Sequence, residues 1–318
     1  DYGYGFKTTD DKLYLTSNDG RNVGSGDSNP AFMKNVISDV SDFSIGLGKV
    51  IVLLNDGTVK CAGDNRSGSC GTGSSSSYVN TFETCVDSND NNMSNVKTVC
   101  AGQYNTFILK NDGTVWGAGF YNFKTLTGYS SDQSKFVQIK LNDGNNLTGI
   151  QYLKLSQMGM GVFAIDGDGN GYIWGSDRYR TPGTDGVDCG VIVIPHDSDP
   201  IVYASLNNGY NGYFEGSFFG GSPYSCLIRE SGKVYKFGGW HGGTLNAPAV
   251  TEITELRPGA DNLGVGKEVV EIEDNDRGLY FRINDGTVYF LGQAPRGEAG
   301  GLFYNSQQNT PVQLASLT

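Results

Sequence analysis

The sequence predicts an all-β protein, a β-propeller built from four-stranded blades. Two observations support this prediction. Glycine, which tight turns between short antiparallel strands require, occurs 47 times. A turn flanked by strand-forming residues recurs every 45 to 63 residues, with anchors at Asp11, Asp56, Asp112, Asp168, Ser231 and Asp285. A strand-rich repeat of roughly 50 residues is typical of propeller blades or β-solenoids.

The clearest copy of the repeat runs from Phe107 to Gly119 and reads F-I-L-K-N-D-G-T-V-W-G-A-G. Two runs of strand-forming residues flank Asn-Asp-Gly, and a two-residue turn centred on Asp-Gly closes a hairpin with positive φ angles. Further copies end at Gly63, Gly175, Gly238 and Gly292, and a weaker one begins at Phe6. Each copy therefore predicts a β-hairpin.

Two more strands are expected after each hairpin, which gives four strands per unit. We count six units over residues 1–318, in one domain, although seven blades remain an alternative. The first unit lacks a strand before Phe6, and the last ends early at Thr318. We expect Leu314 to Leu317 to pair with the N-terminal strands, because closing the ring removes an exposed sheet edge.

The whole chain resembles the repeat of the regulator of chromosome condensation family, which folds as a β-propeller. The resemblance is carried by F-x-L-x-x-D-G-T-V-W-x-x-G, then a Gly-rich loop, then P-x-x-V and V-x-x-V-x-x-G. The family usually has seven blades and a Gly-x-x-His motif, here Gly102-Gln103-Tyr104-Asn105. Its Gly-Gln-Leu-Gly loop corresponds to Ser67-Gly68-Ser69-Cys70-Gly71. The loops for guanine-nucleotide exchange have no match, so the resemblance implies the fold and not that activity.

Cysteines and sequons favour a secreted, divergent member of this family. Six cysteines fall in two groups, Cys61, Cys70, Cys85 and Cys100 in one repeat and Cys189 and Cys226 in another. Clustering within repeats favours disulfides over buried thiols; we prefer 61–100 with 70–85, plus 189–226. Sequons predict glycans at Asn65, Asn92 and Asn146. A start at Asp1 instead of Met fits signal-peptide removal.

Charge and motifs exclude several function classes. The net charge of −11, without a basic cluster, argues against nucleic acid, and no apolar run is long enough to span a membrane. His196 and His241 are the only histidines, and no nucleophile or phosphate-binding motif occurs, so we predict no catalysis and no cofactor. Asp166 to Asn170 resembles a calcium loop but occupies a hairpin turn, so no metal is predicted. The carboxylates of Glu271 to Asp276 are interpreted as a solvated strand face.

One insertion, from Leu206 to Gly221, breaks the repeat with aromatic residues on a Gly-rich loop. They pack within the chain or form a contact surface. The predicted binding residues are Tyr210, Tyr213, Phe214, Phe218, Phe219 and Trp240. We therefore predict a non-catalytic extracellular binding or assembly module, a filament or cell-surface subunit that binds protein or self-associates head to tail. The alternatives are a glycan-binding, lectin-like propeller, an intracellular exchange-factor-like scaffold and a propeller enzyme.

Overall fold

A computed structural model describes residues 4–16, 34–74, 76–121, 124–156, 161–175, 189–206, 224–238, 250–258, 263–275, 278–294 and 306–314. The described residues form an all-β fold in six antiparallel sheets, as predicted. They divide into two compact units, residues 1–167 with 172–175, and residues 168–171 with 176–318. Each unit is described by itself.

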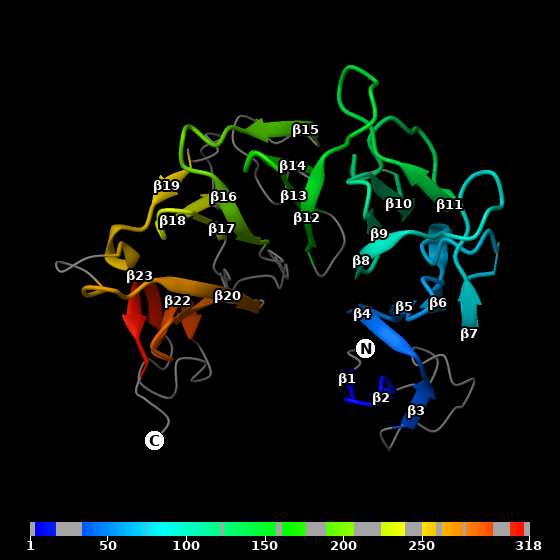
Figure 1. Ribbon diagram of the computed structural model, residues 1–318, viewed down its shortest axis with the longest axis horizontal. Coiled ribbons are helices and arrows are strands. Elements are labelled where there is room, and N and C mark those ends of the chain that lie inside the picture. Colours follow the sequence, from blue (N-terminus) through cyan, green and yellow to red (C-terminus); the bar gives the residue numbers. More distant parts are fainter. Residues whose placement is uncertain are drawn as a thin grey trace, which may run out of the picture. The chain divides into compact units, whose positions relative to one another are not determined.

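The first unit contains three sheets and the first three strands of a fourth (Figure 1). The sheet orders are β1-β2-β3, β4-β5-β6-β7 and β11-β10-β9-β8, and the fourth sheet begins β12-β13-β14. The bounds are β1 Tyr4–Lys7, β2 Leu13–Thr16, β3 Lys34–Ile37, β4 Val40–Gly46, β5 Lys49–Leu54, β6 Val59–Asp64, the 3-10 helix η2 Arg66–Gly68, β7 Tyr78–Thr84, β8 Val96–Ala101, β9 Asn105–Lys110, β10 Val115–Gly119, β11 Gln133–Gln138, β12 Ile150–Leu155, β13 Gly161–Asp166 and β14 Gly171–Gly175.

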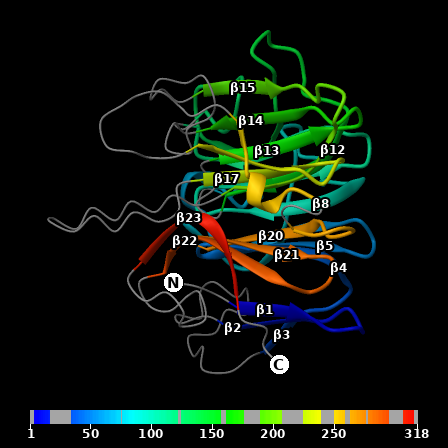
Figure 2. The ribbon, with the colours of Figure 1, turned by 90° about the vertical axis from the view of Figure 1, so that its left-hand side faces the viewer.

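The second unit contains β15 and two four-stranded sheets, ordered β16-β17-β18-β19 and β20-β21-β22-β23. Strands β20 and β21 lie side by side in Figure 2. The bounds are β15 Cys189–Ile194, β16 Ile201–Ser205, β17 Tyr224–Arg229, β18 Val234–Gly238, β19 Thr251–Glu252, the 3-10 helix η4 Thr254–Leu256, β20 Val269–Asn275, β21 Gly278–Ile283, β22 Val288–Ala294 and β23 Ser306–Gln313. Strand β19 has only two residues, since the chain then turns into η4, which buries Leu256.

The hairpins occur where the Asp-Gly motif predicts them, but the turn has three residues instead of two. The N–H of Leu54 donates to the carbonyl of Thr58 at 2.9 Å, and only Gly57 has a positive φ, +84°. The carboxylate of Asp56 accepts the N–H of Thr58 at 2.8 Å. The equivalent bonds at Asp112 and Asp285 are 3.0 and 2.9 Å. The aspartate therefore holds the turn from its side chain, and glycine supplies the left-handed residue.

The grouping of strands into sheets differs from the predicted repeat unit. The strand before each hairpin completes that hairpin's sheet: β4 pairs with β5, and β8 with β9. Only two residues separate β4 from β5, so this connection is itself a tight hairpin, whereas a longer loop separates β7 from β8. Among the described residues the first sheet has three strands, β1, β2 and β3.

The predicted closing strand is not seen in the described residues. The N–H of Leu314 donates to the carbonyl of Val288 at 2.9 Å, so Leu314 extends the sheet that contains β22 and β23. Residues 315–317 lie outside the described residues.

The core of the first unit lies between stacked sheets. Alternate residues of β5 face opposite ways, and both faces are buried. Val50 and Val52 pack with Leu13 of the first sheet. Ile51 packs with Ile108 of the third sheet. A strand buried on both faces favours consecutive apolar residues, which explains the run V-I-V-L-L that follows Lys49.

Candidate functional site

The strongest candidate site in the described residues is the loop that connects β6 to β7, residues 65–77. Asn65 organises this loop. Its Nδ2 donates to the carbonyls of Ser74 and Ser76, at 3.2 and 2.8 Å, and its Oδ1 accepts the N–H of Cys70 at 2.8 Å. Because the Asn65 side chain satisfies three backbone groups, it fixes the loop more tightly than any single backbone turn could.

Two glycines allow the loop to pack against β11. Gly68 has φ +73°, and a Cβ there would lie 2.3 Å from the Cα of Ser134. Gly71 has φ +67°, and its Cβ would lie 2.2 Å from the ring of Phe136. The Ser67–Gly71 segment singled out by the sequence resemblance is therefore the part of the loop that docks on the next sheet.

Replacing Gly68 with Ala is expected to reduce the free energy of unfolding by about 2–3 kcal/mol, because a Cβ meets backbone at a positive φ. Gly57→Ala is the matched control, since Gly57 has φ +84° and nothing within 4 Å of its Cβ. It should cost only about 1 kcal/mol. Urea denaturation measures both values, and equal losses would contradict the close packing of the loop.

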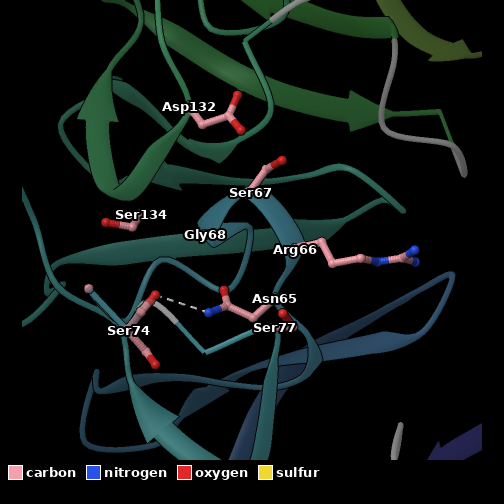
Figure 3. Close-up of a pocket in the computed structure, with 9 residues that line it drawn as sticks. Asn65, Arg66, Ser67, Gly68, Ser74, Ser77, Asp132 and Ser134 are labelled. Carbon is pink, nitrogen blue, oxygen red and sulfur yellow. Dashed lines mark hydrogen bonds between the residues drawn. The ribbon is translucent and has the colours of Figure 1, made fainter.

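A polar pocket of about 280 Å³ lies between this loop and residues 132–134 at the start of β11 (Figure 3). Arg66 and Asp132 are its charged lining residues, and serines dominate the rest. The complete lining is Asn65, Arg66, Ser67, Gly68, Gly73, Ser74, Ser77, Asp132 and Ser134. In Figure 3 the side chain of Arg66 extends away from Asp132 and Ser134.

Arg66 and the buried Asp64 form an ion pair with several hydrogen bonds at the edge of the pocket. The Nε of Arg66 donates to both carboxylate oxygens at 3.0 and 2.9 Å, and Nη2 also donates to Oδ2. The Asp64 side chain is 6% exposed, against 65% for Arg66. Burial raises the pKa of Asp64, but the hydrogen bonds and charge of Arg66 outweigh it and leave that pKa below its ordinary value.

Three half-buried aromatic rings contact one another in a row, and the last residue of the row is bonded to a lining residue of the pocket. Tyr104 and Phe120 have ring centroids 6.0 Å apart, and Phe120 and Tyr121 are 6.1 Å apart. The N–H of Tyr121 donates to Oδ1 of Asp132 at 3.2 Å, which ties the aromatic segment to the pocket. Aromatic rings beside a polar pocket are typical of surfaces that bind protein segments.

A fully buried lysine lies beneath the loop. The Nζ of Lys49 donates to the hydroxyl of Ser69, which in turn donates to the carbonyl of Asp64 at 3.3 Å. Burial lowers the pKa of Lys49, and the neighbouring Cys70, Cys61 and Asp64 oppose that effect only in part. The sequence pattern did not identify Lys49, because it begins a strand of otherwise apolar residues.

The predicted disulfides are not formed. Cys61, Cys70, Cys85 and Cys100 are free thiols, although the first three pack in one core cluster. The Sγ of Cys85 donates to the carbonyl of Cys70 at 3.3 Å.

Burial raises the pKa of Cys61 and Cys85, and of Cys100 to about 12, so these thiols stay protonated and unreactive. Cys226 is likewise in the thiol form, which contradicts the predicted 189–226 bridge; the side chain of Cys189 lies outside the described side chains.

The predicted glycan at Asn65 conflicts with the structure. Its amide is buried and donates both hydrogens to backbone carbonyls, so the nitrogen that would carry the sugar is inaccessible. Asn92 and Asn146 are exposed, and glycans at these two positions stay a prediction.

The predicted aromatic binding residues cannot be placed. Tyr210, Tyr213, Phe214, Phe218, Phe219 and Trp240 all lie outside the described residues, as does His241. His196 is described, and its Nδ1 accepts the N–H of Ser198 at 3.1 Å. In the described part of the chain no group of three His, Cys, Asp or Glu residues could hold a metal. None of the helices described there is long and apolar enough to cross a membrane.

Solved structures share this fold over nearly the whole chain. Human WBSCR16 aligns with a TM-score of 0.73 and 17% identity, covering 99% of this chain and 80% of its own. Prp20p from Saccharomyces cerevisiae aligns with a TM-score of 0.73 and 11% identity, covering 99% and 75%. The fold is a β-propeller of the regulator of chromosome condensation type. No protein-family model matches the sequence, and the search of curated proteins gives no match.

This finding corrects the predicted function and location. Prp20p is described by its binding to Gsp1p and histones. The prediction of a secreted, extracellular assembly module is therefore wrong, and the predicted filament and glycoprotein character lose their support. The free thiols agree with this correction, since disulfides form in oxidising compartments and are rare inside cells.

Proposed function

We propose that this chain is a protein-binding propeller that works inside the cell as an exchange-factor-like scaffold, without catalytic chemistry of its own. The observation that carries the proposal is the shared fold over 99% of the chain with Prp20p, which binds Gsp1p and histones. A propeller places loops at the ends of rigid sheets, and loops on a rigid scaffold are where binding residues concentrate.

The loop surface of the first unit suits a protein partner. It combines the Arg66–Asp64 ion pair and the serine-lined pocket with the rings of Tyr104, Phe120 and Tyr121. Rigid aromatic rings and an oriented arginine are the side chains that most often contribute binding energy at protein interfaces. The segments of this surface are 64–77 and 120–134.

The charge of the chain favours a basic partner. The net charge of −11 attracts positively charged surfaces over a distance of about 8 Å at physiological ionic strength. We therefore expect association to slow as salt is added, because screening weakens attraction between exposed charges.

The proposal is tested by identifying partners through crosslinking in cells and rebuilding each complex from purified components. We expect at least one stoichiometric complex, with crosslinks on residues 64–77 or 120–134. A nucleotide-release assay with a Gsp1p-like partner then separates exchange from scaffolding. If no purified partner forms a complex with the chain, the proposed function is wrong.

A further inference from the structure

The charge balance of the polar pocket identifies the chemistry that it accepts. The Nε and Nη2 groups of Arg66 donate hydrogen bonds to the carboxylate of Asp64, so this ion pair adds no net charge to the pocket. Asp132 is then the remaining ionisable lining residue, and it is exposed. The pocket therefore has one uncompensated negative charge.

The hydrogen-bonding groups of the pocket also suit a cation. Oδ1 of Asp132 accepts the N–H of Tyr121, and in the described residues no bond engages its Oδ2. The hydroxyls of Ser67 and Ser134 line the pocket without a hydrogen-bond partner among the described residues. Figure 3 shows Asp132 and Ser67 together at the upper side of the pocket, whereas Ser134 lies at the left with its hydroxyl pointing away from them. An ammonium group has three donors and no acceptor, so it can use the carboxylate of Asp132 and the hydroxyl of Ser67 together.

We infer that this pocket binds a lysine side chain of a basic partner segment, with its ammonium group at Asp132 and Ser67. The inference rests on the proposed protein-binding function and names the chemistry of the partner. At about 280 Å³ the pocket has room for one long side chain. The N–H of Tyr121 donates to Oδ1 of Asp132, so the Phe120–Tyr121 segment is joined to the pocket by its backbone.

An anionic ligand fits this pocket poorly. It would lie next to the carboxylate of Asp132, in a chain of net charge −11, and Arg66 already uses part of its guanidinium for Asp64. Like charges in one site repel, so a carboxylate or phosphate should bind more weakly than an ammonium group.

The inference is tested with short glycine peptides carrying one central lysine, acetyl-lysine or glutamate, titrated into labelled protein and followed by NMR. We expect the lysine peptide to shift amides in residues 65–77 and 132–134, and acetylation to weaken binding at least fivefold. Asp132→Asn keeps an oxygen for the Tyr121 N–H and should also weaken binding at least fivefold. Asp143→Asn, an exposed turn carboxylate that bonds Asn145 at 2.9 Å, is the matched control and should stay within twofold.

Several results would overturn the inference: equal binding of lysine and acetyl-lysine peptides, stronger binding of the glutamate peptide, or an unchanged affinity in Asp132→Asn. Should Asp132→Asn fail to fold, Ser67→Ala provides the second variant, and an unchanged affinity there has the same meaning. The rebuilt partner complex distinguishes the two proposals. If it survives Asp132→Asn at full affinity, the lysine pocket is wrong and the scaffold stands; if lysine peptides bind but no partner complex forms, the proposed function is wrong and the pocket stands.

Discussion

Replacing Asn65 with Ala is expected to lower the free energy of unfolding by about 3–5 kcal/mol. The change removes bonds to the carbonyls of Ser74 and Ser76 and leaves the buried N–H of Cys70 without its acceptor. Each hydrogen bond contributes about 1 kcal/mol, and a buried donor left without an acceptor costs about 1–3 kcal/mol more. Urea denaturation followed by tryptophan fluorescence measures the loss.

The matched control for this variant is Asn92→Ala. Both asparagines begin N-x-S sequons, but Asn92 is exposed, so its replacement should change stability by less than about 0.5 kcal/mol. Equal effects in the two variants would mean that the Asn65 amide does not hold the loop.

The stability of the protein is expected to rise with pH through the lysine range because of Lys49. Its pKa is lowered in the folded state by burial, from an ordinary value of 10.5. Between that lowered pKa and 10.5 the unfolded chain binds a proton that the folded chain does not. Stability therefore increases with pH across this window, by up to about 1.4 kcal/mol per pH unit.

The Lys49→Met variant isolates this contribution. At about pH 7 it should be more stable than the wild type, because folding no longer removes a charge from water, and the difference should shrink toward about pH 10. Lys97→Met is the control, since Lys97 is an exposed lysine whose Nζ donates to the carbonyl of Gln151 at 2.8 Å. Denaturation curves at several pH values decide the matter. A difference that does not vary with pH would contradict a buried, titrating Lys49.

Much of the fold could be predicted from the sequence because the repeat encodes local chemistry. Asp-Gly-Thr at Asp56, Asp112 and Asp285 specifies a turn by side-chain capping and a left-handed glycine, and both effects act within a few residues. The assignment of strands to sheets was less accessible. It depends on which connecting loops are short enough to close a hairpin. The repeat pattern alone does not show whether a hairpin shares its sheet with the strand before it or with the strands after it.

The candidate site could not be predicted, because it depends on contacts between distant segments. Gly68 contacts Ser134 only after two sheets have stacked. The Arg66–Asp64 ion pair depends in the same way on the fold, because the fold buries Asp64. The cysteine pattern was misleading for a related reason. Clustering in sequence does bring Cys61, Cys70 and Cys85 together, but whether they oxidise depends on the compartment. A useful signal was the Ser67–Gly71 segment, where glycines interrupt a polar loop.

Hydrogen exchange of the backbone amides, measured with and without a rebuilt partner, tests the central claim most directly. If the chain is a protein-binding scaffold that uses its loop surface, the partner should slow exchange in residues 64–77 and 120–134. The hairpin turns at 55–58 and 111–114, at the other ends of the strands, should exchange at the same rate in both samples. Protection confined to those turns, or no protection in the first unit, would contradict the account.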